Sequence, residues 1–84
     1  MPTLRTLEEE LVLLIRERLL ETTPDFSETS NLFDAGLDSM AIMQLLLLIE
    51  EKYGIMLSDA DLSTDNFKSA QQLAILLEMR MKSL

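Results

Sequence analysis

The sequence of 84 residues contains no cysteine and no histidine, and only two glycines and two prolines. Without cysteine, the chain can form no disulfide framework and no thiolate metal site. Without histidine, it lacks the commonest general base and metal ligand near neutral pH. The scarcity of glycine and proline, together with abundant Leu, Glu and Met, favours helices over strands. These absences fit a reducing compartment and exclude a Ser-His catalytic triad.

Basic residues are also few, because 7 Lys and Arg stand against 15 Asp and Glu, for a net charge of −8. Nucleic acid and anionic membranes would repel such a chain, whereas basic protein surfaces would attract it. No apolar run reaches the roughly 18–20 residues of a membrane span, and no signal peptide is evident. We therefore expect a cytoplasmic protein without a membrane span or a nucleic-acid partner.

The length fits one domain over residues 1–84, and its first predicted helix runs from about Leu7 to about Glu21. Thr6 and Glu9 form a capping-box pattern at its start, and the residue before Pro24 is disfavoured in helical conformation. Apolar residues then recur every three or four positions. They predict a core stripe of Leu7, Leu11, Leu14, Ile15 and Leu19.

The second predicted helix spans Ser39 to Tyr53, with Asp38 as N-cap and Gly54 as its left-handed C-terminal residue. One stripe should face the core: Ile42, Leu45, Leu46, Ile49 and Tyr53. A second stripe comprises Met40, Met43, Gln44 and Leu47, followed by Glu50 and Glu51. Either both stripes are core, with Met as adaptable filler, or the second is an exposed partner-binding surface. We expect the second stripe to be exposed.

A long segment joins these two helices, and its apolar residues predict an ordered loop fixed to the core by Phe26, Leu32, Phe33 and Leu37. Ser58 could cap one short helical turn, and Ser69 with Gln72 predicts the start of a last helix that ends at about Lys82. The core stripe of this helix is Ala70, Leu73, Ala74 and Leu77. The expected fold is an all-α, small four-helix bundle of three main helices and one short one.

The acidic residues after Ser58 do not form a calcium-binding loop. Asp59, Asp61 and Asp65 have suitable spacing, but Thr64 and Ala70 occupy the positions of the required glycine and glutamate. We expect a solvated acidic surface and no metal site. Ser39 has no histidine to activate it, so we also expect no enzymatic activity. Considered alone, Ser39 is a plain helix cap.

The segment from Leu32 to Met40, with Gly36-Leu37-Asp38-Ser39 before an apolar helix, resembles acyl carrier proteins, which are phosphopantetheine-dependent carriers. The segment from Ile49 to Ile55 is also similar to that family. The resemblance implies a 4′-phosphopantetheine group on Ser39, next to Asp38. It also implies that the second helix binds partner enzymes through Met40, Met43, Gln44, Leu47, Glu50 and Glu51. Met40 replaces the family's usual Leu, and Ala41 and Gln44 stand where acidic residues are frequent.

The partners implied by this resemblance are a phosphopantetheinyl transferase and acyl-loading and acyl-processing enzymes with basic docking surfaces. The carrier would be a monomer that holds acyl intermediates of fatty-acid, polyketide or specialised lipid biosynthesis. One alternative is an aminoacyl carrier, either D-alanyl or peptidyl. Another alternative, from a different class, is an acidic helical adaptor without a prosthetic group, in which Ser39 only caps the helix.

Overall fold

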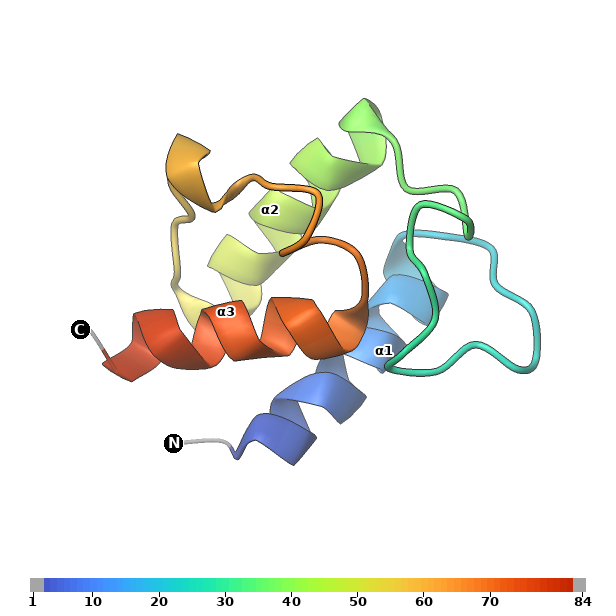
Figure 1. Ribbon diagram of the computed structural model, residues 1–84, viewed down its shortest axis with the longest axis horizontal. Coiled ribbons are helices and arrows are strands. Elements are labelled where there is room, and N and C mark those ends of the chain that lie inside the picture. The colour runs from blue at the N-terminus through green and yellow to red at the C-terminus, as the bar shows by residue number, and fades with distance from the viewer. Residues whose placement is uncertain (1–2, 83–84) are drawn as a thin grey trace.

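The computed structural model describes residues 3–82, which form three α-helices, one short 3-10 helix and no strand (Figure 1). The elements are α1 (Leu4–Arg18), α2 (Ser39–Tyr53), η1 (Asp59–Asp61) and α3 (Ala70–Lys82). This order confirms the predicted all-α fold with a long loop between the first two helices. The two residues at each end of the predicted 1–84 domain lie outside the described range. None of the described helices has the length and apolarity needed to cross a membrane.

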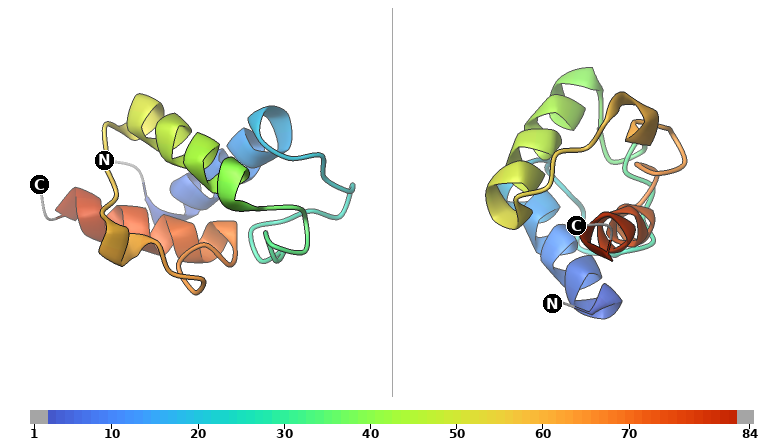
Figure 2. Two further views of the ribbon diagram at one scale, coloured as in Figure 1. Left: turned by 90° about the horizontal axis from the view of Figure 1, so that it is seen from above. Right: turned by 90° about the vertical axis from the view of Figure 1, so that its left-hand side faces the viewer.

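The helices surround one apolar core. Helices α1 and α3 pack against each other, α2 lies along another side of the core, and the segment that contains η1 connects α2 to α3 (Figures 1 and 2). The largest fully buried side chains come from all three helices and both long connections: Leu7, Leu11, Ile15, Leu32, Leu45, Ile49, Phe67, Leu73 and Leu77. The predicted stripe of α3 is buried throughout, and Leu76 is buried in addition.

Helix α1 begins and ends one turn earlier than predicted. Thr3 is its N-cap, and the Oγ1 of Thr3 accepts a hydrogen bond from the backbone N–H of Thr6 at 3.2 Å. The predicted Thr6–Glu9 capping box is therefore wrong, and Glu9 instead pairs with Arg5 at 3.3 Å. The earlier start adds Leu4 to the apolar row that packs on the core.

The end of α1 at Arg18 also places the apolar stripe differently from the prediction. Leu7, Leu11 and Ile15 are fully buried, whereas Leu14 and Leu19 are only partly buried. The backbone N–H groups of Leu19 and Leu20 both donate to the carbonyl of Ile15, at 3.2 and 2.9 Å. The chain leaves the helix there, well before Pro24, and both leucines pack against the core.

The loop between α1 and α2 is ordered by apolar residues and by two backbone hydrogen bonds to the start of α3. Phe26, Leu32 and Leu37 are buried as predicted, whereas Phe33 is only partly buried. The N–H of Leu32 donates to the carbonyl of Lys68 at 2.8 Å. The N–H of Gln71 donates to the carbonyl of Glu28 at 2.9 Å. The loop is thus part of the folded domain and not a linker.

Asp61 corrects the prediction that the acidic residues after Ser58 are solvated, because its side chain is buried. Its Oδ2 accepts hydrogen bonds from the N–H and the hydroxyl of Ser58, at 2.9 and 3.1 Å. Its Oδ1 accepts from the guanidinium of Arg80 on α3. This bond from Arg80 holds the pKa of Asp61 below its ordinary value of 3.8. The network fixes η1 to α3.

Asp61→Asn is expected to lower the free energy of unfolding by about 1–3 kcal/mol at neutral pH, because Arg80 loses its buried partner. The pKa of Asp61 is lower in the folded state than in the unfolded state. Its contribution is therefore complete above the unfolded value of 3.8 and is lost as pH falls through the folded value. Chemical denaturation of wild type and variant from pH 7 to about pH 2 should give stabilities that converge at the acidic end.

The matched control is Asp59→Asn, since Asp59 is an exposed carboxylate in the same short helix. We expect this control to keep the stability and the pH dependence of the wild type. A loss of stability at neutral pH that is equal in the two variants would contradict the role assigned to the Asp61 network.

Candidate functional site

The N-terminus of α2 is built by three consecutive residues with different roles. Gly36 has a φ of +112°, in the left-handed region that favours glycine, so it allows the chain to turn toward α2. Leu37 is buried and anchors the end of the loop in the core. Asp38 is extended, with a φ of −128°. Its Oδ1 accepts a hydrogen bond from the N–H of Ala41 at 2.9 Å, which confirms it as the N-cap.

Ser39 is the first residue of α2, and its side chain is exposed. Its hydroxyl makes no hydrogen bond with any residue in the range 3–82, so it is free to react. The first turn of a helix has unpaired N–H groups and the positive end of the helix dipole, which together favour a bound phosphate. The first turn of α2 contains no acidic residue. The position therefore combines an accessible hydroxyl with an environment that stabilises an attached phosphate.

The outward side of α2 is exposed as expected. Met40, Met43 and Leu47 are 77, 67 and 66% exposed, which excludes the alternative that both stripes are core. We call the six residues predicted to bind partners the α2 face: Met40, Met43, Gln44, Leu47, Glu50 and Glu51, all of which are exposed. A surface with this many exposed apolar side chains is typical of a protein-binding site.

The inward side of α2 is rotated relative to the prediction. Ala41, Leu45 and Ile49 are buried, one helical turn apart. Ile42, Leu46 and Tyr53, which were predicted to be core, are only partly buried. The small side chain of Ala41 carries little hydrophobic signal, which explains why the sequence analysis missed it.

A shallow apolar hollow of about 260 Å³ adjoins the α2 face. Its lining residues are Met43, Leu46, Leu47, Glu50, Met56 and Leu57. Sequence reasoning missed Met56, which follows the end of α2 and is 79% exposed. The exposure of Met56 could have been inferred from its position directly after Ile55, because the buried side chain of Ile55 leaves that of Met56 directed outward.

The C-terminal end of α2 is held by Tyr53 and Gly54. The hydroxyl of Tyr53 donates to Oε1 of Glu10 on α1 at 2.8 Å. Burial and this hydrogen bond raise the pKa of Tyr53 well above its ordinary value of 10.0, so the phenol stays protonated. Gly54 has a φ of +70°, and its N–H donates to the carbonyl of Glu50 at 2.8 Å. The predicted end of the helix is therefore confirmed.

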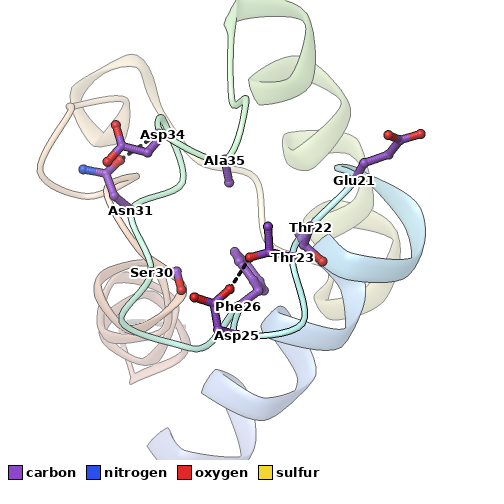
Figure 3. Close-up of a pocket in the computed structure, with 9 residues that line it drawn as sticks. All are labelled: Glu21, Thr22, Thr23, Asp25, Phe26, Ser30, Asn31, Asp34 and Ala35. Atoms are coloured by element: carbon purple, nitrogen blue, oxygen red, sulfur yellow. Dashed lines mark hydrogen bonds between the residues drawn. The ribbon is translucent and has the colours of Figure 1, made fainter.

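A second, more polar hollow of about 370 Å³ lies within the long loop (Figure 3). Its lining residues are Glu21, Thr22, Thr23, Asp25, Phe26, Ser30, Asn31, Asp34 and Ala35. Thr23 donates its hydroxyl hydrogen to Asp25, and this bond lowers the pKa of Asp25. Oδ1 of Asn31 accepts from the N–H groups of Phe33 and Asp34, at 2.9 and 3.1 Å. The polar groups of this hollow thus stabilise the loop. Within residues 3–82, no group of three or more His, Cys, Asp or Glu side chains could hold a metal ion.

The sequence matches the family described as "Phosphopantetheine attachment site" over residues 9–77. Because this match covers most of the chain, the protein belongs to this family of phosphopantetheine-dependent carrier domains. The match confirms the resemblance found in the sequence. It also confirms the predicted prosthetic group, 4′-phosphopantetheine, which in this family is attached covalently to a serine.

Solved structures of carrier proteins have the same fold. The first is the carrier protein from Agrobacterium tumefaciens, solved with an engineered Bradyrhizobium japonicum glycine:[carrier protein] ligase and ATP. It is 27% identical, with a TM-score of 0.69, and the match covers 92% of this chain and 99% of that one. No curated protein sequence is significantly similar to this chain.

Two further structures support the fold alone. One contains a glycylated carrier protein bound to the Bradyrhizobium japonicum ligase, with 23% identity, a TM-score of 0.62 and coverage of 87% of this chain and 95% of that one. The other contains the cognate carrier protein of that ligase with an analogue of glycyl adenylate. Its identity is 22% and its TM-score 0.60, and the match covers 96% of each chain.

Proposed function

We propose that the protein carries its 4′-phosphopantetheine group on Ser39 and presents cargo, held as a thioester on that group, to partner enzymes. The observation that carries this proposal is the free, exposed hydroxyl of Ser39 at the N-terminus of α2, in a chain of the phosphopantetheine attachment family. A phosphopantetheinyl transferase would supply the group from coenzyme A. The serine would then be joined to a phosphate that the first turn of α2 stabilises.

We propose that the α2 face binds these partners. Its exposed apolar side chains offer area that can be buried reversibly, and Glu50 and Glu51 offer charge to a basic docking surface. The protein itself would not be a catalyst, because it has no histidine to activate a serine nucleophile and no cysteine nucleophile. The chemistry would belong to the enzymes that load and process the cargo.

An acyl group is the cargo that the residues around Ser39 support, because Gly36-Leu37-Asp38-Ser39 is similar to acyl carriers of fatty-acid, polyketide or specialised lipid biosynthesis. A second candidate is an aminoacyl group. It is supported by the 27% identical Agrobacterium carrier protein, which was solved with a glycine:[carrier protein] ligase. Both candidates use the same arm and the same serine.

The experiment that tests the proposal is intact mass spectrometry after incubation with coenzyme A and a phosphopantetheinyl transferase. The expected result is a single addition of the phosphopantetheine mass, which peptide mapping places on Ser39. A chain that stays unmodified with several transferases would favour the adaptor without a prosthetic group. In one experiment, the chain that carries the phosphopantetheine group is then offered glycine, ATP and the Bradyrhizobium ligase. In a second experiment, the unmodified chain is loaded by the transferase from an acyl-coenzyme A. Each loaded form is incubated with the enzymes of the protein's own pathway, and intact mass shows whether those enzymes act on the aminoacyl or on the acyl group. The group on which they act identifies the cargo class.

The acidic surface predicts that loading depends on salt. The second-order rate of phosphopantetheine transfer is expected to fall as ionic strength rises, because charges more than about 10 Å apart are largely screened at 0.1 M salt. The measurement is kcat/KM for the carrier protein from about 0.02 to about 0.5 M NaCl. A rate that stays constant over this range would mean that the net charge of −8 does not guide the encounter.

A further inference from the structure

A third hollow, of about 230 Å³, extends the α2 face onto α1. Its lining residues are Arg18, Gln44, Leu47 and Leu48. Gln44 and Leu47 belong to the α2 face, whereas Arg18 is the last residue of α1. Figure 2 shows the C-terminal end of α1 beside the N-terminal half of α2. A partner that covers Gln44 and Leu47 would therefore also meet Arg18.

Arg18 is an exposed positive charge without an ion-pair partner in the part of the chain that the structure describes. Arg5, Arg80 and Lys82 each pair with a carboxylate, whereas Arg18, like Arg16, Lys52 and Lys68, does not. Its nearest acidic neighbours in sequence, Glu17 and Glu21, form no ion pair with it. The stretch of α2 from Ser39 to Ile49 has no acidic residue that could neutralise it.

A simpler role for Arg18 is to stabilise the negative end of the α1 dipole. Arg16 occupies the same last turn and would serve that role equally well. Residues two positions apart lie about 200° apart around a helix, so Arg16 is directed away from the hollow that Arg18 lines. The dipole therefore does not explain why a free guanidinium stands beside the exposed Leu47 and the partly buried Leu48 on the proposed docking surface.

We propose that Arg18 belongs to the docking surface and that this surface fits an enzyme presenting a carboxylate beside an apolar side chain. This inference rests on the proposed function. The apolar side chain would enter the hollow next to Leu47 and Leu48, and the carboxylate would pair with the guanidinium, which can bind it through two hydrogen bonds. A uniformly basic partner would instead be repelled at this point.

The charges on the docking surface then have a fixed order. Arg18 lies beside the middle of α2, and Glu50 and Glu51 follow toward its C-terminal end. A partner with a carboxylate and a basic group in the matching order can bind in one orientation only, because the reversed orientation would bring like charges together.

The test uses the transferase that loads the wild-type protein in the mass experiment above. The kcat/KM of Arg18→Glu is expected to fall at least about tenfold below that of the wild type, because an interfacial charge pair becomes a repulsive contact. Arg18→Lys should stay within about threefold, because the charge is kept but the two-bond geometry is lost. Arg16→Glu is the matched control, with the same change in net charge on the same turn, and should stay within about twofold.

A second measurement identifies the partner's carboxylate. Acidic residues on the docking surface of the transferase are replaced one at a time by Lys, and one of these variants should restore the loading of Arg18→Glu. An Arg18→Glu chain that is loaded as fast as Arg16→Glu, or faster than the wild type, would overturn the inference while leaving Ser39 as the attachment site. A wild-type chain that no transferase loads would overturn the proposed function and this inference together.

Discussion

Ser39→Ala is expected to abolish phosphopantetheine attachment completely while leaving the fold intact. The variant should show no mass addition after incubation with coenzyme A and the transferase, because no other group replaces the reacting hydroxyl. Its free energy of unfolding should change by no more than about 0.5 kcal/mol, the usual range for an exposed substitution that breaks no specific contact. The reason is that Asp38, and not Ser39, caps α2.

A suitable control for Ser39→Ala is Ser63→Ala, which also removes an exposed serine hydroxyl but lies outside the α-helices. The Oγ of Ser63 accepts a hydrogen bond from the backbone N–H of Asn66 at 3.2 Å, so this substitution removes only a local hydrogen bond. Ser63→Ala should be loaded like the wild type. Loading of Ser39→Ala at any other serine would move the attachment site away from the N-terminus of α2.

Leu45→Ala is expected to be the most destabilising of three neighbouring alanine substitutions in α2. Leu45 is fully buried, so the change should cost about 2–5 kcal/mol of unfolding free energy. That is a large share of the roughly 5–15 kcal/mol that stabilises a typical domain. Leu46 is only partly buried and should cost less than Leu45. Leu47 is 66% exposed, so its substitution should change stability by about 0.5 kcal/mol or less.

The same three variants separate stability from partner binding. Leu47→Ala should reduce kcat/KM for loading although its unfolding midpoint is unchanged, because Leu47 belongs to the α2 face. Urea denaturation and loading kinetics are measured on each purified variant. If Leu47→Ala loses as much stability as Leu45→Ala, the helix is buried on both sides and the α2 face cannot be the docking surface.

The elements that could be predicted from the sequence are those defined by local chemistry. The limits of α2 follow from Asp38, which caps its N-terminus, and from Gly54, which adopts the left-handed conformation at its end. The apolar stripe of α3 recurs at regular helical spacing, and all of its predicted residues are buried. The caps of α2 are interactions between residues close in sequence, and the stripe of α3 is marked by its regular spacing although its burial comes from packing against the rest of the core.

The features that could not be predicted depend on tertiary packing. In α2 almost every residue from Met40 to Ile49 is apolar, so the sequence gives little indication of which side faces the core. Thr3 and Thr6 are equally good caps locally, and the choice between them depends on Leu4 packing against the core. Asp61 is buried because the fold brings Arg80 to it.

The two backbone hydrogen bonds between the long loop and the start of α3 have a consequence for folding during synthesis. Glu28 and Leu32 find their partners in Gln71 and Lys68, which leave the ribosome much later. Until then the loop lacks these two bonds, because a long chain segment must close before such distant contacts can form. The loop around Glu28 and Leu32 is therefore fixed only after the start of α3 has been made. A transferase that requires the ordered loop would modify chains that include the start of α3 and leave shorter nascent chains unmodified.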